Sequence, residues 1–103
     1  VIHTVGPVWR GGGHGEEAQL ASCYRASLAL AEREGFASLA FPAISTGIYG
    51  FPAPRAARIA VGELRSFLAR HPLPERVLLV AFDSASARIL EAALDETPAQ
   101  ELP

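Results

Sequence analysis

A stretch near the middle of the chain combines residue types that could hold a phosphate group. Residues 39–44 are mostly apolar and are expected to form a buried strand, and Ser-Thr-Gly-Ile-Tyr-Gly follows at residues 45–50. Pro52 and Pro54 then suit the first turn of a helix. In α/β proteins a strand, a glycine-containing loop and a helix start hold phosphate, because loop N–H groups and the positive helix end point at its oxygens. A tight turn with glycines at positive φ would account for the same spacing.

Tyr49 favours the ligand-binding interpretation of this loop. Its aromatic hydroxyl lies near the loop apex between two glycines, where it has little chain to pack against and would suit a bound ring. Ser45 could instead belong to a hydrolase nucleophile elbow, Gly-x-Ser-x-Gly, but the first glycine is missing and no histidine follows Asp83. Ser45 is therefore expected to line a phosphate site with its hydroxyl and N–H rather than to act as a nucleophile.

The order of apolar runs predicts a βαβαβα arrangement. Strands are expected at residues 1–5, 38–43 and 76–82, and helices at residues 16–34, 53–70 and from residue 83 or 84 onward. This alternation favours a parallel-rich, three-layer α/β sheet, and the uninterrupted run at 76–82 is typical of a strand covered on both faces. The expected inward positions are Leu20, Cys23, Tyr24, Ser27, Leu28, Ala31, Ala57, Ala60, Val61, Leu64, Phe67, Leu68, Ile89, Leu90, Ala93 and Leu94.

Charged and capping residues mark the expected helix ends. Glu16 and Glu17 suit the first turn of the first helix, where acidic groups complement the helix dipole. Gly35 suits the C-terminal end of that helix, and Asp83 or Ser84 can cap the start of the last one. These signals place the helix boundaries independently of the apolar pattern.

The composition fits one soluble globular domain. The chain has 103 residues, half of them hydrophobic and 19% charged. A net charge of −2 provides no basic footprint for nucleic acid or an anionic membrane, so neither is an expected partner. The single cysteine excludes an internal disulfide and favours a cytoplasmic location. The absence of lysine suggests GC-rich coding and hence a bacterium.

Three blocks of the sequence closely resemble the macro domain family. In chain order they are residues 1–9 (VIHTVGPVW), 23–28 (CYRASL) and 40–52 (AFPAISTGIYGFP). Within the family they are similar to the MacroD-type branch, which includes O-acetyl-ADP-ribose deacetylases. The likeness runs from Val1 to about Leu94. The family's Asn-Ala-Ala-Asn and Gly-Gly-Gly-Val-Asp-Gly-Ala-Ile-His segments, which carry the catalytic aspartate, do not occur in this chain.

The resemblance implies binding of ADP-ribose or O-acetyl-ADP-ribose, and ADP-ribosylated proteins as further partners. The diphosphate would lie in the loop at residues 45–50, and Tyr49 would fix the distal ribose as the one catalytic residue carried over. No metal and no cofactor are implied, and neither Asp83 nor Asp95 lies in matching sequence. The expected ligand-binding residues are Ala43, Ile44, Ser45, Thr46, Gly47, Ile48, Tyr49, Gly50 and Phe82.

The leading hypothesis is a partial macro domain at residues 1–96, incomplete at its N-terminus and followed by a frayed tail at residues 97–103. A chain without methionine that begins inside an apolar strand pattern is expected to be a fragment. Its parent would hydrolyse ADP-ribosyl esters, either O-acetyl-ADP-ribose or modified acidic side chains of proteins. Whether the chain alone is an enzyme stays open. The alternatives are a non-catalytic ADP-ribose reader or remnant, and an α/β fragment without independent function.

The remaining chemistry-bearing residues are expected to be structural, with two left open. The glycine-rich run at residues 11–15 has no accompanying aspartate, so we expect a flexible connector rather than a phosphate loop. Trp9 could stack on a ligand or pack over the sheet edge, and Phe82 could contact the nucleoside or pack in the core. No metal-ligand spacing relates the histidines and the cysteine, which are His3, His14, Cys23 and His71.

Overall fold

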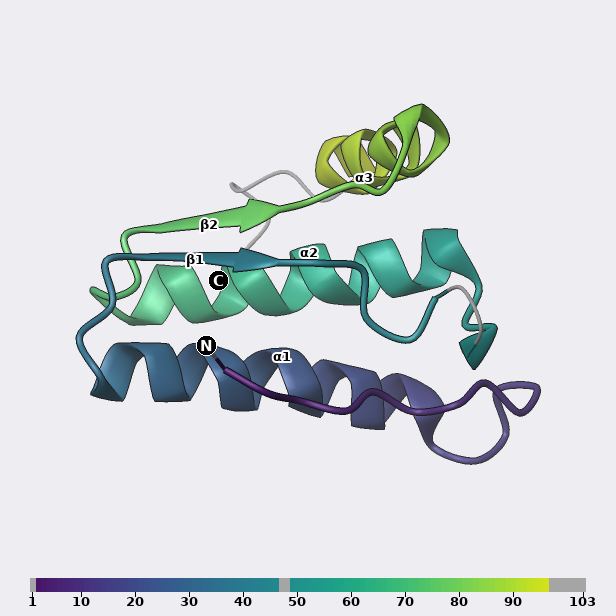
Figure 1. The fold of residues 1–103 in the computed structure, drawn as a ribbon, viewed down its shortest axis with the longest axis horizontal. Helices are drawn as coiled ribbons and strands as arrows, with labels where there is room; N and C mark the ends of the chain where they lie inside the picture. The colour runs from purple at the N-terminus through teal and green to yellow at the C-terminus, as the bar shows by residue number, and fades with distance from the viewer. Residues whose placement is uncertain (1, 47–48, 97–103) are drawn as a thin grey trace.

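A computed structural model describes residues 2–46 and 49–96 (Figure 1). Its strands β1 and β2 pair in parallel, with Ser38 opposite Arg76 and Phe41 opposite Leu79. The alternating helices and parallel strands confirm the α/β class. The elements in chain order are α1 (Glu16–Arg33), β1 (Ser38–Phe41), α2 (Ala53–Arg70), β2 (Arg76–Leu79) and α3 (Ser84–Glu96).

The predicted capping groups hold the helix ends. Gly35, at φ 76°, follows α1 and donates its N–H to the carbonyl of Glu32, and the N–H of Phe36 reaches back to Ala31. These two bonds form a Schellman motif, which only a residue at positive φ allows without strain. At the start of α3 the Asp83 carboxylate accepts the N–H of Ser86 at 2.8 Å. That bond lowers the pKa of Asp83 below its usual range.

The core lies where α1, α2 and β1 meet. Leu20, Tyr24 and Leu28 of α1 are buried against α2, whose small alanines let the two helices lie side by side (Figure 1). The Tyr24 and Phe41 rings pack at 5.0 Å between centroids. The helix α3 packs on the other side of α2 through Ala93 and its neighbours. Most inward positions were therefore predicted correctly, but Leu94 was not, because it is largely exposed.

The predicted strand at residues 1–5 is wrong for the described residues 2–5, which are irregular. This segment runs beside α1 (Figure 1), where the Cys23 thiol donates to the carbonyl of Val5 at 3.4 Å. A strand needs a paired neighbour, and within the described parts of the chain the strands pair only with each other. β1 and β2 are also shorter than predicted. The hydrogen bond from the Val80 N–H to the Phe41 carbonyl is the last one between the two segments, and the strands end there.

One face of the sheet is open, so the expectation that residues 76–82 are covered on both faces is wrong. Val77 and Leu79 face the helices, whereas Leu78 between them is 53% exposed, and Val80 and Phe82, which follow β2, are 54% and 92% exposed. Side chains of a strand alternate between faces, and α1, α2 and α3 leave this second face uncovered. Exposed apolar residues that lie together are the usual feature of surfaces that associate.

We expect the isolated chain to self-associate at micromolar concentrations through these residues. Leu78→Glu should shift the population towards monomer, because a charge on the open face opposes its burial. Phe36→Glu, which alters an exposed phenylalanine outside the strands, is the matched control and should change nothing. Analytical ultracentrifugation measures both. An unmodified chain that sediments as a monomer at all of these concentrations would contradict this expectation.

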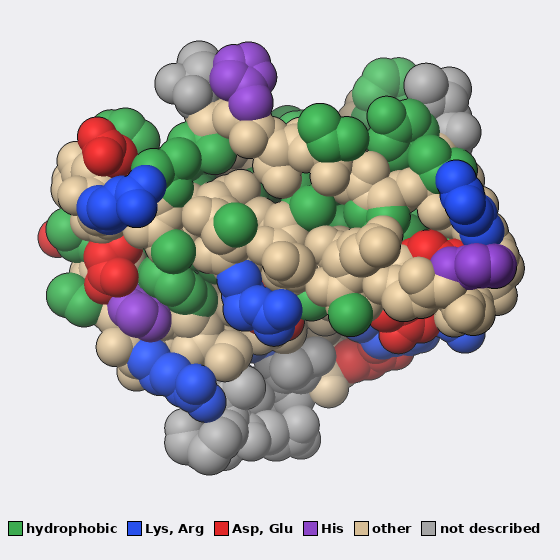
Figure 2. Space-filling model, turned by 90° about the horizontal axis from the view of Figure 1, so that it is seen from below, with side chains coloured by type: hydrophobic (Ala, Val, Ile, Leu, Met, Phe, Trp, Pro, Cys, Tyr) green, Lys and Arg blue, Asp and Glu red, His purple; other side chains and the backbone are tan. Residues whose placement is uncertain are grey.

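Charges of both signs are interspersed on the face seen in Figure 2 rather than gathered by sign. In the described part of the chain, ion pairs link α1 to α2, namely Arg25 with Glu63 and Glu17 with Arg55. The Glu32 carboxylate also lies within hydrogen-bond distance of the His71 ring at the end of α2. Exposed pairs of this kind contribute at most about 1 kcal/mol each to stability. Apolar packing therefore dominates the α1–α2 contact. Among the helices that the structure describes, none combines the length and the hydropathy that a membrane-spanning segment requires.

Candidate functional site

The loop between β1 and α2 is a closed turn at the carboxyl end of β1. Ser45 adopts the left-handed conformation at φ 66°, which is rare for a residue with a side chain. Its carbonyl accepts the N–H of Phe51 at 3.0 Å, and Gly50 at φ 75° turns the chain back for that bond. Of the predicted ligand residues in this loop, Gly47 and Ile48 lie outside the described residues.

The α2 helix presents an uncapped N-terminus to this loop. Its N-cap is Pro52, which has no side-chain acceptor, and no side-chain cap bond is present at this end among the described residues. The first intrahelical bond runs from Ala56 N–H to the Pro52 carbonyl, so the earlier N–H groups of Ala53 and Arg55 have no helical acceptor. Such an end carries partial positive charge and suits an anion.

Ser45 lies against the N-terminal segment. Its side chain is 7% exposed, and its hydroxyl has no hydrogen-bond partner within the described structure. A Cβ added to Gly6 would collide with this hydroxyl and lie 2.5 Å from Ile44 Cγ2. Gly6 is therefore required for close approach of the two segments. A hydroxyl buried in this way is placed neither to act as a nucleophile nor to line a phosphate site, so of the two Ser45 groups expected there only the N–H remains a candidate.

Trp9 is joined to the ligand loop at Tyr49. The backbone N–H of Trp9 donates to the Tyr49 carbonyl at 2.8 Å, and the Trp9 ring packs on Phe51 at 4.8 Å between centroids. The Arg55 guanidinium lies 5.5 Å from the same ring centroid, within cation–π range. The indole thus packs on the residues that follow the loop rather than over the sheet edge.

A pocket opens at the carboxyl ends of both strands, beside the loop. Ala43, Ile44 and Thr46 line it together with residues of α2, β2 and α3. Tyr24 also lines it, and burial raises the pKa of the Tyr24 hydroxyl to about 12. Phe82 is not part of this lining and is exposed, so the alternative of core packing for Phe82 is wrong.

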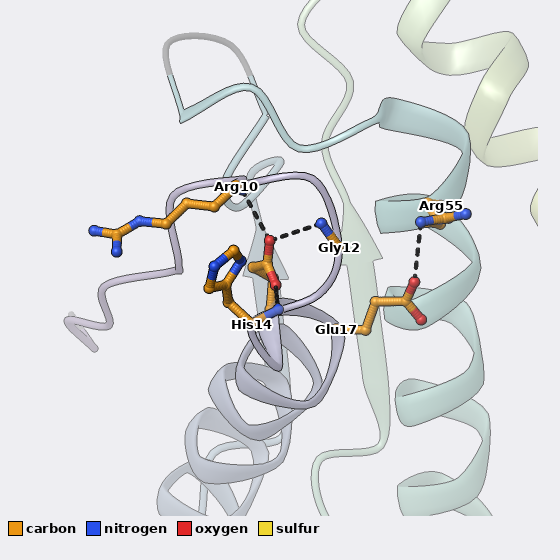
Figure 3. Close-up of polar contacts among 6 residues, drawn as sticks. Arg10, Gly12, His14, Glu17 and Arg55 are labelled. Atoms are coloured by element: carbon orange, nitrogen blue, oxygen red, sulfur yellow. Dashed lines mark hydrogen bonds and ion pairs between the residues drawn. The ribbon is translucent and has the colours of Figure 1, made fainter.

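Sequence reasoning missed the burial of Glu16. Its side chain is 2% exposed, and its carboxylate accepts the N–H groups of Arg10, Gly12 and His14 at 2.8, 2.9 and 2.7 Å. These bonds converge in Figure 3. Burial alone raises the pKa of Glu16, but the N–H groups of Arg10, Gly12 and His14, together with its own backbone N–H, outweigh burial and bring the pKa down to about 2.

The glycine-rich run at residues 11–15 is therefore not the flexible connector that we expected. Its N–H groups wrap around the Glu16 carboxylate, which holds the loop and leaves those groups unavailable to a phosphate. The one sequence feature that could have indicated this loop structure is a glutamate directly after a glycine-rich run. A glutamate at a helix start is usually solvated, so the sequence did not distinguish this buried position.

His71 and Cys23 take structural positions. The His71 ring pairs with Glu32 at 2.9 Å and stacks on Phe67 at 3.9 Å between centroids. Cys23 is partly covered beside the core. Over residues 2–46 and 49–96, no group of three or more His, Cys, Asp or Glu side chains could hold a metal ion.

Comparison with known proteins gives the family. The Macro domain family model matches residues 1–60, more than half of the chain. The chain belongs to the macro domain family. It is 55% identical over 96 residues to a protein of Citrobacter koseri named O-acetyl-ADP-ribose deacetylase, covering 93% of this chain and 54% of that protein. A macro domain-containing protein of Methanosarcina mazei is 52% identical over 96 residues, covering 93% and 51%.

Solved macrodomains share the fold. A macrodomain of Oceanobacillus iheyensis with ADP matches with a TM-score of 0.87 and 37% identity, covering 91% of this chain and 49% of that one. A Trypanosoma brucei macrodomain in complex with ADP-ribose matches with a TM-score of 0.79 and 37% identity, covering 89% and 38%. This macro domain chain spans about half the length of the curated relatives it matches.

Proposed function

We propose that this macro domain chain binds ADP-ribose, with the diphosphate in the β1–α2 loop. The observation that carries the proposal is the uncapped N-terminus of α2 beside a loop closed by the Ser45–Phe51 hydrogen bond. A diphosphate needs several converging donors, and backbone N–H groups supply them without lysine. The solved relatives with ADP or ADP-ribose support this ligand class.

The placement of the diphosphate in the β1–α2 loop also determines where the ribose and the nucleoside of the ligand would lie. The distal ribose would lie beside Tyr49, whose carbonyl is fixed by Trp9. Phe82 follows β2 at the same edge of the sheet, where ligands of open α/β sheets bind, and its exposed ring would contact the nucleoside. O-acetyl-ADP-ribose and ADP-ribosylated proteins present the same diphosphate and are proposed as related ligands.

A second candidate function is ester hydrolysis, which the name of the Citrobacter koseri relative supports. That reaction needs a base to orient water beside the distal ribose. Asp83 does not offer one readily, because its carboxylate already accepts the Ser86 N–H as the cap of α3. Within the described residues the geometry therefore favours binding over turnover. Hydrolysis is proposed for the complete family domain, with Tyr49 holding the sugar.

Ligand-dependent thermal unfolding tests the binding proposal. At an ADP-ribose concentration of about 100 times Kd, the chain should gain about 2.7 kcal/mol of stability, because the ligand binds only the folded state. ADP should also stabilise the chain, whereas ribose without phosphate should not. An unchanged unfolding transition at millimolar ADP-ribose would contradict the proposal.

A turnover assay with O-acetyl-ADP-ribose should show almost no hydrolysis by the chain alone.

A further inference from the structure

The glycine-rich loop before α1 is organised around a single buried carboxylate. Glu16 lies inside the loop and receives N–H groups from three of its residues, so the loop cannot move without breaking charge-assisted bonds. Glu17, the next residue, points instead to Arg55 at 3.3 Å and is half exposed (Figure 3). The two adjacent glutamates therefore have different roles.

This loop packs directly against Trp9. A Cβ added to Gly12 would lie 2.9 Å from Cη2 of the Trp9 ring, so Gly12 forms one wall of the space that the indole fills. Phe51 and the Arg55 guanidinium contact the same ring. The indole is thus enclosed by the residues that Glu16 holds and by the residues that follow the ligand loop.

Trp9 in turn contacts the ligand loop through its backbone. Its N–H bond to the Tyr49 carbonyl is the described link between the N-terminal segment and the apex of that loop. A shift of Trp9 would therefore move Tyr49. Because binding and reaction geometry tolerate errors of only about an ångström, such a shift would be costly to the site.

We infer that Glu16 is a positioning residue that, through the loop it holds, fixes Trp9 against Tyr49 and so sets the shape of the ligand loop. This inference rests on the proposed ADP-ribose site. The hydrogen-bond partners of the Glu16 carboxylate are Arg10, Gly12 and His14, so its effect on the ligand loop passes through Gly12 and Trp9. The depressed pKa of Glu16 agrees with a carboxylate that remains ionised inside this loop at neutral pH.

Two matched pairs of variants test the inference on the 103-residue chain. Gly11 and Gly12 both have φ 91°, so alanine strains the backbone equally at each, but only the Gly12 methyl would meet Trp9. Gly12→Ala should therefore weaken ADP-ribose binding about tenfold more than Gly11→Ala. Glu16→Gln should likewise weaken binding about tenfold, whereas Glu34→Gln, at the exposed C-cap of α1, should leave it unchanged.

Two readouts do not depend on ligand. Trp9 is the only tryptophan, so its fluorescence should shift to the red and its acrylamide quenching should rise in Gly12→Ala and Glu16→Gln, with faster hydrogen exchange at the Trp9 N–H. Equal behaviour of Gly11→Ala and Gly12→Ala in fluorescence and exchange would overturn the inference, even if Glu16→Gln fails to fold. If the unmodified chain does not bind ADP-ribose, the proposed function fails, while these readouts still decide whether the loop fixes Trp9.

Discussion

Replacing Gly6 by valine is expected to remove most of the affinity of the chain for ADP-ribose. The new side chain would collide with the buried Ser45 hydroxyl and with Ile44, so the segment that starts the ligand loop must move. Loss of one or two hydrogen bonds to phosphate, at about 1.5–3 kcal/mol each, corresponds to roughly a hundredfold weaker binding. Overpacking should also cost about 1–3 kcal/mol of folding free energy.

Gly62→Val is the matched control for this prediction. Gly62 lies inside α2 with open space around its Cβ position and no positive φ, so valine should be tolerated there. Isothermal titration calorimetry gives both affinities, and circular dichroism checks that each variant is folded. A folded Gly6→Val chain with unchanged affinity would show that the position of Ser45 does not matter for the ligand.

Removing the Tyr49 side chain is expected to have its largest effect on hydrolysis. In a domain completed with the family's Asn-Ala-Ala-Asn and Gly-Gly-Gly-Val-Asp segments, Tyr49→Ala should slow hydrolysis of O-acetyl-ADP-ribose by about a hundredfold, because the ribose would be misplaced. Affinity should fall less, since the backbone donors to the diphosphate remain. Steady-state kinetics with product detection separates kcat from KM.

Tyr49→Phe distinguishes the roles of the ring and the hydroxyl in the completed domain. If the ring positions the sugar by contact, phenylalanine should retain most of the activity that alanine loses. Equal rates for the unmodified and Tyr49→Ala domains would remove Tyr49 from the mechanism. Hydrolysis by the 103-residue chain alone at the rate of the completed domain would show that another group, such as Asp83, supplies the base.

The helices could be predicted from the sequence because their signals are local. Pro52 and Pro54 mark the start of α2, and the helix covers Ala53–Arg70 as predicted. Gly35 terminates α1 through its positive φ, and Asp83 caps α3. Apolar residues at helical spacing then identify the buried faces, since side chains three and four positions apart share one face.

The strands could not be predicted as well, because a strand depends on distant neighbours. Residues 1–5 have the apolar composition of a strand but have no paired neighbour among the described residues. The apolar run at residues 76–82 indicates burial, yet whether both faces are covered depends on elements elsewhere in the fold. Leu78 and Val80 are exposed for this reason.

The candidate site was predictable in its location but not in its connections. The strand, loop and helix pattern places Ala43, Ile44 and Thr46 at the carboxyl end of β1, where the pocket lies. No local sequence pattern predicts the contact of Trp9 with Tyr49, because the two residues are far apart in the chain. The hydrogen bonds of Glu16 to the glycine-rich loop likewise have no recognised sequence pattern. The family resemblance supplies the ligand class, whereas the burial of Glu16 required the three-dimensional structure.

Mapping of the amide chemical shifts of the 103-residue chain during an ADP-ribose titration tests the central claim most directly. We expect saturable shifts at Ser45, Thr46 and Tyr49 and at the uncapped N–H groups of Ala53 and Arg55, because these groups surround the proposed diphosphate site. Amides at the opposite end of the molecule, such as those near Gly35, should not move. Saturable shifts confined to other elements, or no shifts at millimolar ADP-ribose, would contradict the assignment of the β1–α2 loop as the ligand site.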